Sequence, residues 1–291
     1  GTKEPDTGLY VNNINASALF SATTWSYTVS LNEGNNTFNV YTKDEAGNQS
    51  APVIASVIRD TTPPVISSST TVNSAYTNQG GAIDIVLSDS YSTVDLQASL
   101  SGAVVRSASG AGVSGTWAVQ NGHLVFTPSS ALTDSVYTIT LYPVDSLGNT
   151  GAVSFSFTMD VTQPQVQSLT MNPSSPHKAE TVAFIFTFNE DMSTAVAPSI
   201  TFGINSPYNS FQISGSWTNA RTWQGTYTFT KSTGDGSYNI MVSGAKDRAG
   251  NLMAATEAGS FVLDTGTPNP PVLDPISTPT KIAAITLSGT K

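Results

Sequence analysis

The sequence predicts an all-β chain of tandem β-sandwich modules joined by short proline-containing linkers. Three observations lead to this fold class. Thr, Ser, Val, Asn and Gly dominate the composition, and 16 Pro and 23 Gly interrupt it as turn residues. Short runs alternate apolar and polar residues along the whole length, which is typical of half-buried strands. Two turn-like segments also recur with a common period.

Composition excludes several classes of function. The 291 residues include no Cys, so disulfides, thiolate catalysis and Cys-based zinc sites are excluded. The net charge is −9 with only 11 Lys and Arg, which argues against binding to nucleic acid. No apolar run approaches the roughly 20 residues of a membrane-spanning helix.

The repeated segments define modules of roughly 100 residues. The first segment has the pattern Asp-x-x-Gly-Asn and begins at Asp44, Asp145 and Asp247. The second has the pattern Asp-x-x-x-Pro and begins at Asp60, Asp160 and Asp264. Proline cannot donate a hydrogen bond to a sheet, so we expect the second segment to end one module and lead into the next.

Each Asp-x-x-Gly-Asn segment is predicted to join two strands as a hairpin. In the second module, Tyr137-x-Ile139-x-Leu141 precedes the segment and Val153-x-Phe155-x-Phe157 follows it. Tyr137 and Tyr238 stand where a tyrosine corner is expected in such sandwiches, whereas Phe38 stands there in the first module. The sequence shows no convincing helix.

The segment Asp44-Glu-Ala-Gly-Asn48, a strand, and then Asp60-Thr-Thr-Pro-Pro64 resemble the bacterial immunoglobulin-like repeats of large adhesins, S-layer-associated proteins and other surface fibres. The segments beginning at Asp160 and Asp264 depart from the commoner Asp-Thr-Thr-x-Pro. The resemblance implies immunoglobulin-like sandwiches, an extracellular or cell-surface location, and a role as spacer, fibre or adhesin rather than enzyme.

The periodicity predicts four segments. They are a module without its opening strands (1–61), two full modules (62–161 and 162–266), and the opening strands of a further module (267–291). Within the last segment, residues 281–287 are predicted to form a strand.

The chain begins and ends with the same tripeptide, Gly1-Thr2-Lys3 and Gly289-Thr290-Lys291. Two hypotheses explain it. The chain is one period of a continuous array whose partners are neighbouring copies in cis, or it is a filament subunit whose residues 271–291 complete the first module of the next subunit.

Catalytic constellations are not expected. The two histidines, His123 and His177, belong to different modules and are interpreted as solvated loop or edge residues. Glu190 and Asp191 are adjacent, so in a strand they point to opposite faces and do not form an acid–base pair.

Calcium is the one cofactor that the sequence favours. In an immunoglobulin-like sandwich the entry linker, the loop after the second strand and the last hairpin share one pole, and Ca²⁺ prefers oxygen ligands. The resemblance also implies calcium between modules. The candidate ligands for module two are Asp60, Asp89 and Asp145, and those for module three are Asp160, either Glu190 or Asp191, and Asp247. For module one they are Asp44, either Glu4 or Asp6, and Asp264 supplied by a preceding copy. The alternative is that these aspartates hydrogen-bond their own turns.

Trp217 and Trp223 are the candidates for stacking on a glycan if the chain is an adhesin. They flank a predicted hairpin turn at residues 218–222 in module three. Packing in the core is the commoner role of tryptophan in a sandwich and stays open as the alternative.

Overall fold

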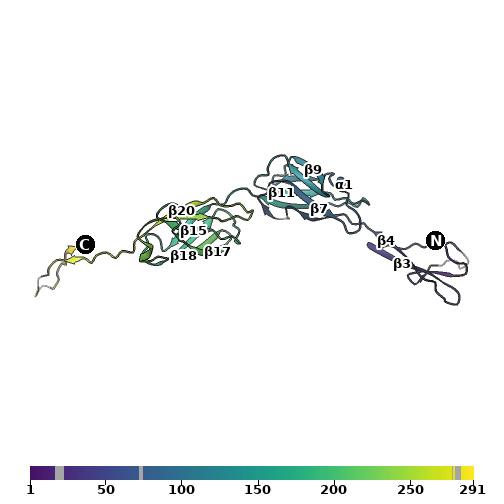
Figure 1. The fold of residues 1–291 in the computed structure, drawn as a ribbon, viewed down its shortest axis with the longest axis horizontal. Helices are drawn as coiled ribbons and strands as arrows, with labels where there is room; N and C mark the ends of the chain where they lie inside the picture. Colours follow the sequence, from purple (N-terminus) through teal and green to yellow (C-terminus); the bar gives the residue numbers. More distant parts are fainter. Residues whose placement is uncertain (17–22, 72–74, 277, 279–282) are drawn as a thin grey trace. The chain divides into compact units, whose positions relative to one another are not determined.

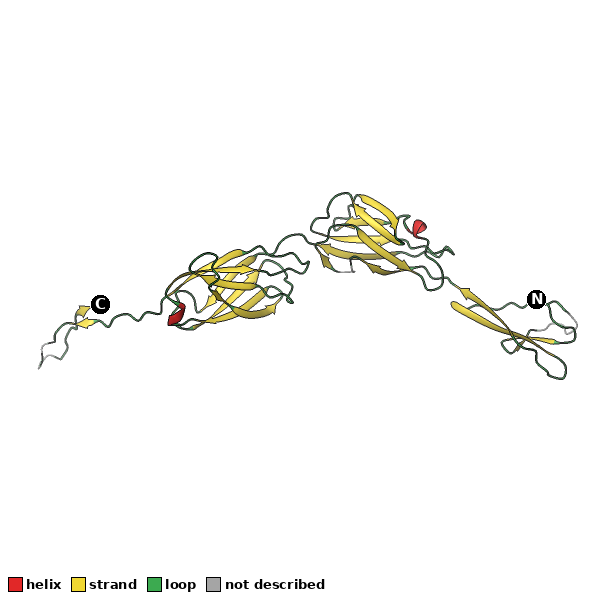
Figure 2. Cartoon of the chain, viewed as in Figure 1, coloured by secondary structure: helices red, strands yellow, loops and turns green. Residues whose placement is uncertain are grey.

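The computed structural model describes residues 1–16, 23–71, 75–276, 278 and 283–291. The chain divides into two compact units, Gly1–Met159 and Asp160–Lys291. Strands dominate both units (Figures 1 and 2). The fold is all-β, as the alternating pattern predicts.

The first module contains one sheet, with strand order β2-β1-β3-β4. The hairpin of β3 and β4 encloses the first Asp-x-x-Gly-Asn segment, and Gly47 in it has φ of 90°, which favours glycine. Among the described residues of this module, no second sheet faces the first one. The strands are β1 (Gly8–Val11), β2 (Ile14–Asn15), β3 (Gly34–Lys43) and β4 (Val53–Arg59).

The second module is a sandwich of two four-stranded sheets, β5-β7-β10-β9 and β6-β12-β11-β8. Alternate residues of the facing strands form its core; Ile85 of β7 and Ile139 of β11 are fully buried. Its strands are β5 (Val65–Ser69), β6 (Tyr76–Thr77), β7 (Ile83–Ser88), β8 (Val104–Ser107), β9 (Gly115–Gln120), β10 (His123–Pro128), β11 (Ser135–Leu141) and β12 (Val153–Met159).

The third module repeats this plan with sheets β13-β14-β18-β17 and β16-β15-β19-β20. Its core is rich in aromatic side chains, including Phe184, Phe202 and Trp223. Its strands are β13 (Val166–Asn172), β14 (Thr181–Phe188), β15 (Ser199–Gly203), β16 (Phe211–Gln212), β17 (Ser214–Asn219), β18 (Thr222–Thr228), β19 (Gly236–Ser243) and β20 (Thr256–Leu263).

Both full modules are immunoglobulin-like β-sandwiches. The strand before each hairpin carries a tyrosine corner: Tyr137 donates its hydroxyl to the Thr133 carbonyl at 3.0 Å, and Tyr238 donates to the Thr233 carbonyl at 2.7 Å. The predicted tyrosine corners are therefore confirmed.

Two short helical turns were not anticipated. Residues Leu96–Ser99 form α1, where the Asp95 side chain accepts a hydrogen bond from the backbone N–H of Ala98 as an N-cap. Residues Lys231–Thr233 form the 3-10 turn η1. Neither is long enough to carry an apolar periodicity, which is why the pattern could not reveal them. Over the described residues, no helix has the length and hydropathy to cross a membrane.

The segment after the third module forms only a two-residue ladder, β21 (Val272–Leu273) with β22 (Gly289–Thr290). The prediction of a strand at 281–287 is wrong for residues 283–287, which are not in a strand, and residues 281 and 282 lie outside the described part. A strand requires a neighbouring strand, and in the described part of this segment only Val272–Leu273 and Gly289–Thr290 pair with each other.

Candidate metal centres

The first candidate centre lies at the start of module two. Asp60 comes from the linker after β4, Asp89 from the loop after β7, and Asp145 from the hairpin between β11 and β12. One carboxylate oxygen from each lies within 4.8 Å of the others. Two oxygens that each lie about 2.4 Å from one Ca²⁺ are separated by at most twice that distance, so this spacing fits a shared cation.

The hairpin turn holds Asp145 in place. Its Oδ1 accepts hydrogen bonds from the backbone N–H groups of Leu147 and Asn149, and its Oδ2 accepts from the Ser92 hydroxyl and the Asn149 side-chain amide. Burial raises the pKa of Asp145, but these hydrogen bonds outweigh burial and lower the pKa to about 2. The buried carboxylate is therefore charged at neutral pH.

One carboxylate oxygen of Asp60 has no hydrogen-bond partner. Its Oδ1 accepts from the backbone N–H and the hydroxyl of Thr62, both at 3.0 Å, whereas its Oδ2 is buried and has no hydrogen-bond partner. Only 9% of Asp60 is exposed. A buried carboxylate oxygen without a donor is costly, and a bound cation would compensate for it. The donor set of hard oxygens and this orphaned atom both fit calcium.

The second candidate centre repeats the first at the start of module three. It comprises Asp160, Glu190 and Asp247, whose carboxylate oxygens also lie within 4.8 Å of one another. Asp247 is 1% exposed, and its Oδ1 accepts from the backbone N–H groups of Gly250 and Asn251. The longer side chain of Glu190 stands where Asp89 stands in the first centre.

Glu190 has an unusual pKa. Burial raises it first, and the negative charges of Asp160 and Asp247 raise it further, to about 7. Three carboxylates in one place repel one another, so the free centre takes up a proton on Glu190 as the pH falls below about 7, and a divalent cation would displace that proton.

An asparagine ties each linker to its hairpin. Asn149 donates its side-chain amide to the Asp60 carbonyl at 3.2 Å, and Asn251 donates to the Asp160 carbonyl at 2.8 Å. The sequence analysis did not assign a role to these residues, although Asn is the last residue of every Asp-x-x-Gly-Asn segment. That recurrence was the available signal.

Of the other proposed ligands, Asp191 stays outside the second centre, and Asp44, Asp264, Glu4 and Asp6 belong to the module-one set, which needs a preceding copy. Asp191 points away from Glu190 and accepts a hydrogen bond from Arg221 Nε at 2.7 Å. Asp44 accepts hydrogen bonds from the backbone and side chain of Asn48 in its own turn. Asp264 accepts from the backbone N–H of Gly266. Within one copy these hydrogen bonds match the alternative in which an aspartate serves its own turn, and the centre formed with Asp264 of a preceding copy stays a prediction.

The interpretation of His177 as a solvated residue is wrong. Its side chain is fully buried and stacks on Phe229 with ring centroids 5.5 Å apart. The backbone of His177 bridges to Leu263 of β20, which draws the side chain between the sheets. Burial lowers the pKa of His177, and the negative charge of Glu180, whose Oε1 lies 3.6 Å from Nδ1 of His177, partly offsets this effect.

His123 is partly exposed, and its Nδ1 pairs with Oδ1 of Asp84 at 2.7 Å.

The two tryptophans proposed as glycan ligands pack in module three. Trp223 is 1% exposed and packs edge-on against Phe186, so a sugar cannot reach its ring. Trp217 is half-buried against Phe188 and donates its indole N–H to the Val196 carbonyl at 3.0 Å. The predicted hairpin between them is confirmed by the pairing of Asn219 with Thr222.

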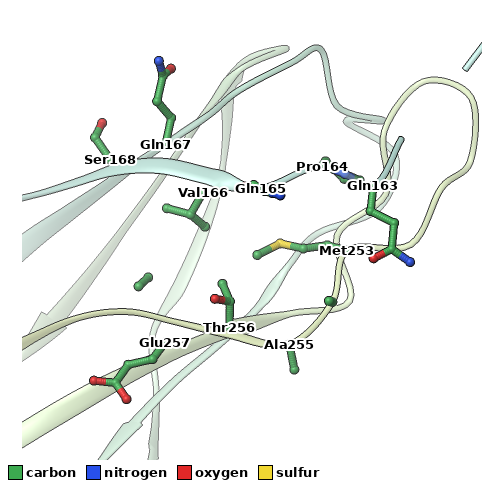
Figure 3. Close-up of a pocket in the computed structure, with 12 residues that line it drawn as sticks. Gln163, Pro164, Gln165, Val166, Gln167, Ser168, Met253, Ala255, Thr256 and Glu257 are labelled. Carbon is green, nitrogen blue, oxygen red and sulfur yellow. The ribbon is translucent and has the colours of Figure 1, made fainter. Parts of the chain in front are cut away.

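A cleft of about 380 Å³ separates the start of β13 from the start of β20. Figure 3 shows the side chains of Val166, Met253 and Thr256 pointing into it, while those of Gln167 and Glu257 point away. The groups that enter the cleft are thus apolar or hydroxyl groups and carry no charge.

No protein-family model matches the chain, and no curated protein matches it. Three solved structures illustrate the fold likeness. The Escherichia coli adhesin FdeC is 14% identical, with 79% of this chain and 74% of that chain covered and a TM-score of 0.42. A tetra-tandem repeat from the extending region of a large adhesion protein is 20% identical, with coverages of 90% and 68% and a TM-score of 0.31.

The fibronectin(III)-like modules of Clostridium thermocellum CbhA are 15% identical, with coverages of 69% and 93% and a TM-score of 0.33. At these scores the likeness carries no argument about function.

Proposed function

We propose that the chain is a structural repeat segment, a spacer, stalk or fibre, of a long secreted cell-surface protein. Calcium at the start of modules two and three stiffens it. The observation that carries this proposal is the repetition of one arrangement, a linker aspartate, a loop carboxylate and a hairpin aspartate, at equivalent places in two modules.

The mechanism is mechanical. Each linker aspartate is the first residue after the last strand of the preceding module, so a cation held by Asp60 or Asp160 fixes the linker to the sandwich that follows. Asn149 and Asn251 support the same attachment through the linker carbonyls. An ion that orders a linker removes its bending freedom, and an array of such modules then resists bending along its length.

The binding test is titration of the full chain with Ca²⁺ by calorimetry. We expect two ions per chain, one for each centre. Asp60→Asn removes the first ion only, and Asp160→Asn removes the second only. Asp191→Asn is the matched control, because Asp191 is next to Glu190 but pairs with Arg221, and it keeps both ions. Absence of binding at millimolar calcium would refute the calcium part of the proposal.

The stiffness test is small-angle X-ray scattering of the full chain in calcium and in chelator. We expect the maximum dimension and the radius of gyration to fall in chelator as the linkers bend. The double variant Asp60→Asn/Asp160→Asn should show the chelator profile even in calcium. An identical profile in all conditions would contradict calcium stiffening. The alternative of an adhesin module that binds a glycan or a host receptor has less support, because Trp223 is buried and Trp217 is half-buried with its indole N–H bonded to Val196.

A further inference from the structure

Two consecutive residues of the linker between modules one and two are bonded to different modules. The side chain of Asp60 joins the first candidate centre together with Asp89 and Asp145 of module two. The next residue, Thr61, is bonded instead to Glu33, which directly precedes β3 of module one. One residue of the linker therefore contacts the module that follows, and its neighbour contacts the module that precedes.

Glu33 binds Thr61 with both of its carboxylate oxygens. Its Oε1 accepts a hydrogen bond from the backbone N–H of Thr61 at 2.9 Å, and its Oε2 accepts one from the Thr61 hydroxyl at 2.8 Å. Arg59 Nη1 lies 3.4 Å from the same Oε2. Two charge-assisted hydrogen bonds to one carboxylate fix the orientation of the donor residue as well as its position. We call this arrangement of Glu33 and Thr61 the linker clasp.

The same bonds recur where the chain leaves module three. Asp235 directly precedes β19, and its Oδ1 accepts from the backbone N–H of Thr265 at 2.8 Å and from the Thr265 hydroxyl at 2.7 Å. These hydrogen bonds, the backbone one first, hold the pKa of Asp235 below its ordinary value. Thr265 follows the linker aspartate Asp264 as Thr61 follows Asp60. Equivalent residues thus make equivalent bonds in two modules.

The clasp and the candidate centre act on opposite sides of the linker. The clasp is complete without a cation, because its donors and acceptors are all protein groups. The centre gathers carboxylates that repel one another, so its attachment of the linker depends on the cation. A linker that is attached on one side only leaves the other module free to swing, and resistance to bending therefore requires both attachments.

We infer that Glu33 is a positioning residue for the first centre: its clasp holds the linker to module one, so that calcium bound by Asp60 couples two modules instead of anchoring a loose linker to module two. Asp235 gives the linker after module three the same attachment. This inference rests on the proposed function and deepens it, because it names the second contact through which calcium stiffens the chain. The clasp holds with and without the ion, and calcium closes the other side.

Hydrogen exchange of single amides, followed by NMR in chelator, tests the clasp by itself. Glu33→Ala removes both acceptors, so the Thr61 amide should exchange roughly three to ten times faster, as expected for the loss of an exposed charge-assisted bond. The Thr62 amide donates to Asp60 Oδ1 and should change less. Glu45→Ala removes the same charge from the hairpin turn of module one and should leave the Thr61 amide unchanged. Equal Thr61 exchange in the parent and in Glu33→Ala would overturn the inference.

Scattering in saturating calcium tests the role of the clasp in stiffness. Glu33→Ala should still bind two ions in calorimetry, with the first held about threefold more weakly because the linker is less preorganised. Its radius of gyration in calcium should fall toward the value of the parent in chelator. Thr61→Val removes the hydroxyl bond but keeps the pair of Glu33 with Arg59, so it should give an intermediate value. Glu45→Ala should match the parent.

The inference and the proposed function fail in different ways. If calcium stiffens the parent and Glu33→Ala equally, the positioning role of Glu33 is overturned while the calcium proposal stands. A parent that binds no calcium refutes the calcium proposal and the positioning role together, whereas the Thr61 exchange in chelator still decides whether the clasp exists. Glu33 lies at the surface, so Glu33→Ala should keep the circular dichroism spectrum of the parent.

Discussion

The side-chain amide of Asn149 donates a hydrogen bond to the main-chain carbonyl of Asp60, a residue 89 positions earlier in the chain. The same amide also donates to Asp145 Oδ2 at 2.8 Å. One side chain therefore joins the entry linker of module two to its last hairpin, and Asn251 does the same between Asp160 and Asp247.

Loss of either asparagine should loosen the linker. Asn149→Ala leaves the Asp60 carbonyl and an oxygen of Asp145 without this donor, and we expect a loss of about 1 kcal/mol in the stability of module two. Hydrogen–deuterium exchange of residues 60–64 should become faster. Asn48→Ala is the matched control, because the exposed Asn48 donates to Asp44 within its own turn. Equal exchange at the linker in the parent and in Asn149→Ala would contradict the attachment.

Glu190 should make the calcium-free module three less stable as the pH rises. Its folded pKa of about 7 lies above its ordinary value of 4.5, so its contribution to stability is complete below pH 4.5 and is lost as the pH passes through 7. We expect the stability difference between the parent and Glu190→Gln in chelator to fall across this window, by at most about 1.4 kcal/mol per pH unit.

Denaturant unfolding at pH 5 and pH 8 measures this difference. Calcium at pH 8 should restore stability to the parent, because the cation replaces the lost proton as the partner of the three carboxylates. If the difference between parent and variant is the same at both pH values, the three carboxylates do not share a proton in solution.

His177 should make module three less stable as the pH falls, which is opposite to the effect of Glu190. Burial holds its pKa below the ordinary value of 6.5, so its contribution is complete above pH 6.5 and is lost as the pH falls through the folded pKa. His177→Phe cannot titrate and continues the stacking with Phe229. We therefore expect the parent to lose stability relative to His177→Phe as the pH falls below 6.5. His123→Phe, at a partly exposed position, serves as the comparison. A constant difference would mean that His177 is hydrated in solution.

The two tryptophans of module three should differ in stability. Trp223→Ala empties a site in the middle of the aromatic core and should cost about 3–5 kcal/mol. Trp217→Ala removes a half-buried ring and one hydrogen bond and should cost less. Denaturant unfolding followed by circular dichroism measures both. A smaller loss for Trp223→Ala than for Trp217→Ala would contradict the placement of Trp223 in the core.

Local sequence patterns were sufficient to predict strands and hairpins within the modules. The alternation in Tyr137-x-Ile139-x-Leu141 predicted an inward-facing strand, and all three residues are buried. The three Asp-x-x-Gly-Asn segments predicted hairpins, and their glycines have φ values of 90°, 86° and 96°. These features depend on residues that are neighbours in the chain, so their signals appear in the sequence.

The sequence predicted all three carboxylates of the first candidate centre, but it left one carboxylate of the second centre open. The shared pole of a sandwich predicted that Asp60, Asp89 and Asp145 would meet. The choice of Glu190 over Asp191 depended on which way each side chain points. The role of His177 was missed for the same reason, because a Pro-His pair in a loop carries no sign of the β20 backbone that encloses it.

The sequence by itself determined that this chain is a periodic all-β array with hairpins at regular places, since alternation and turn residues act over a few positions. The tertiary structure decided which carboxylates share a cation-sized space and which aromatic rings are out of reach. Those properties arise when strands distant in the chain pack together and exclude water, and burial and pKa are set only there.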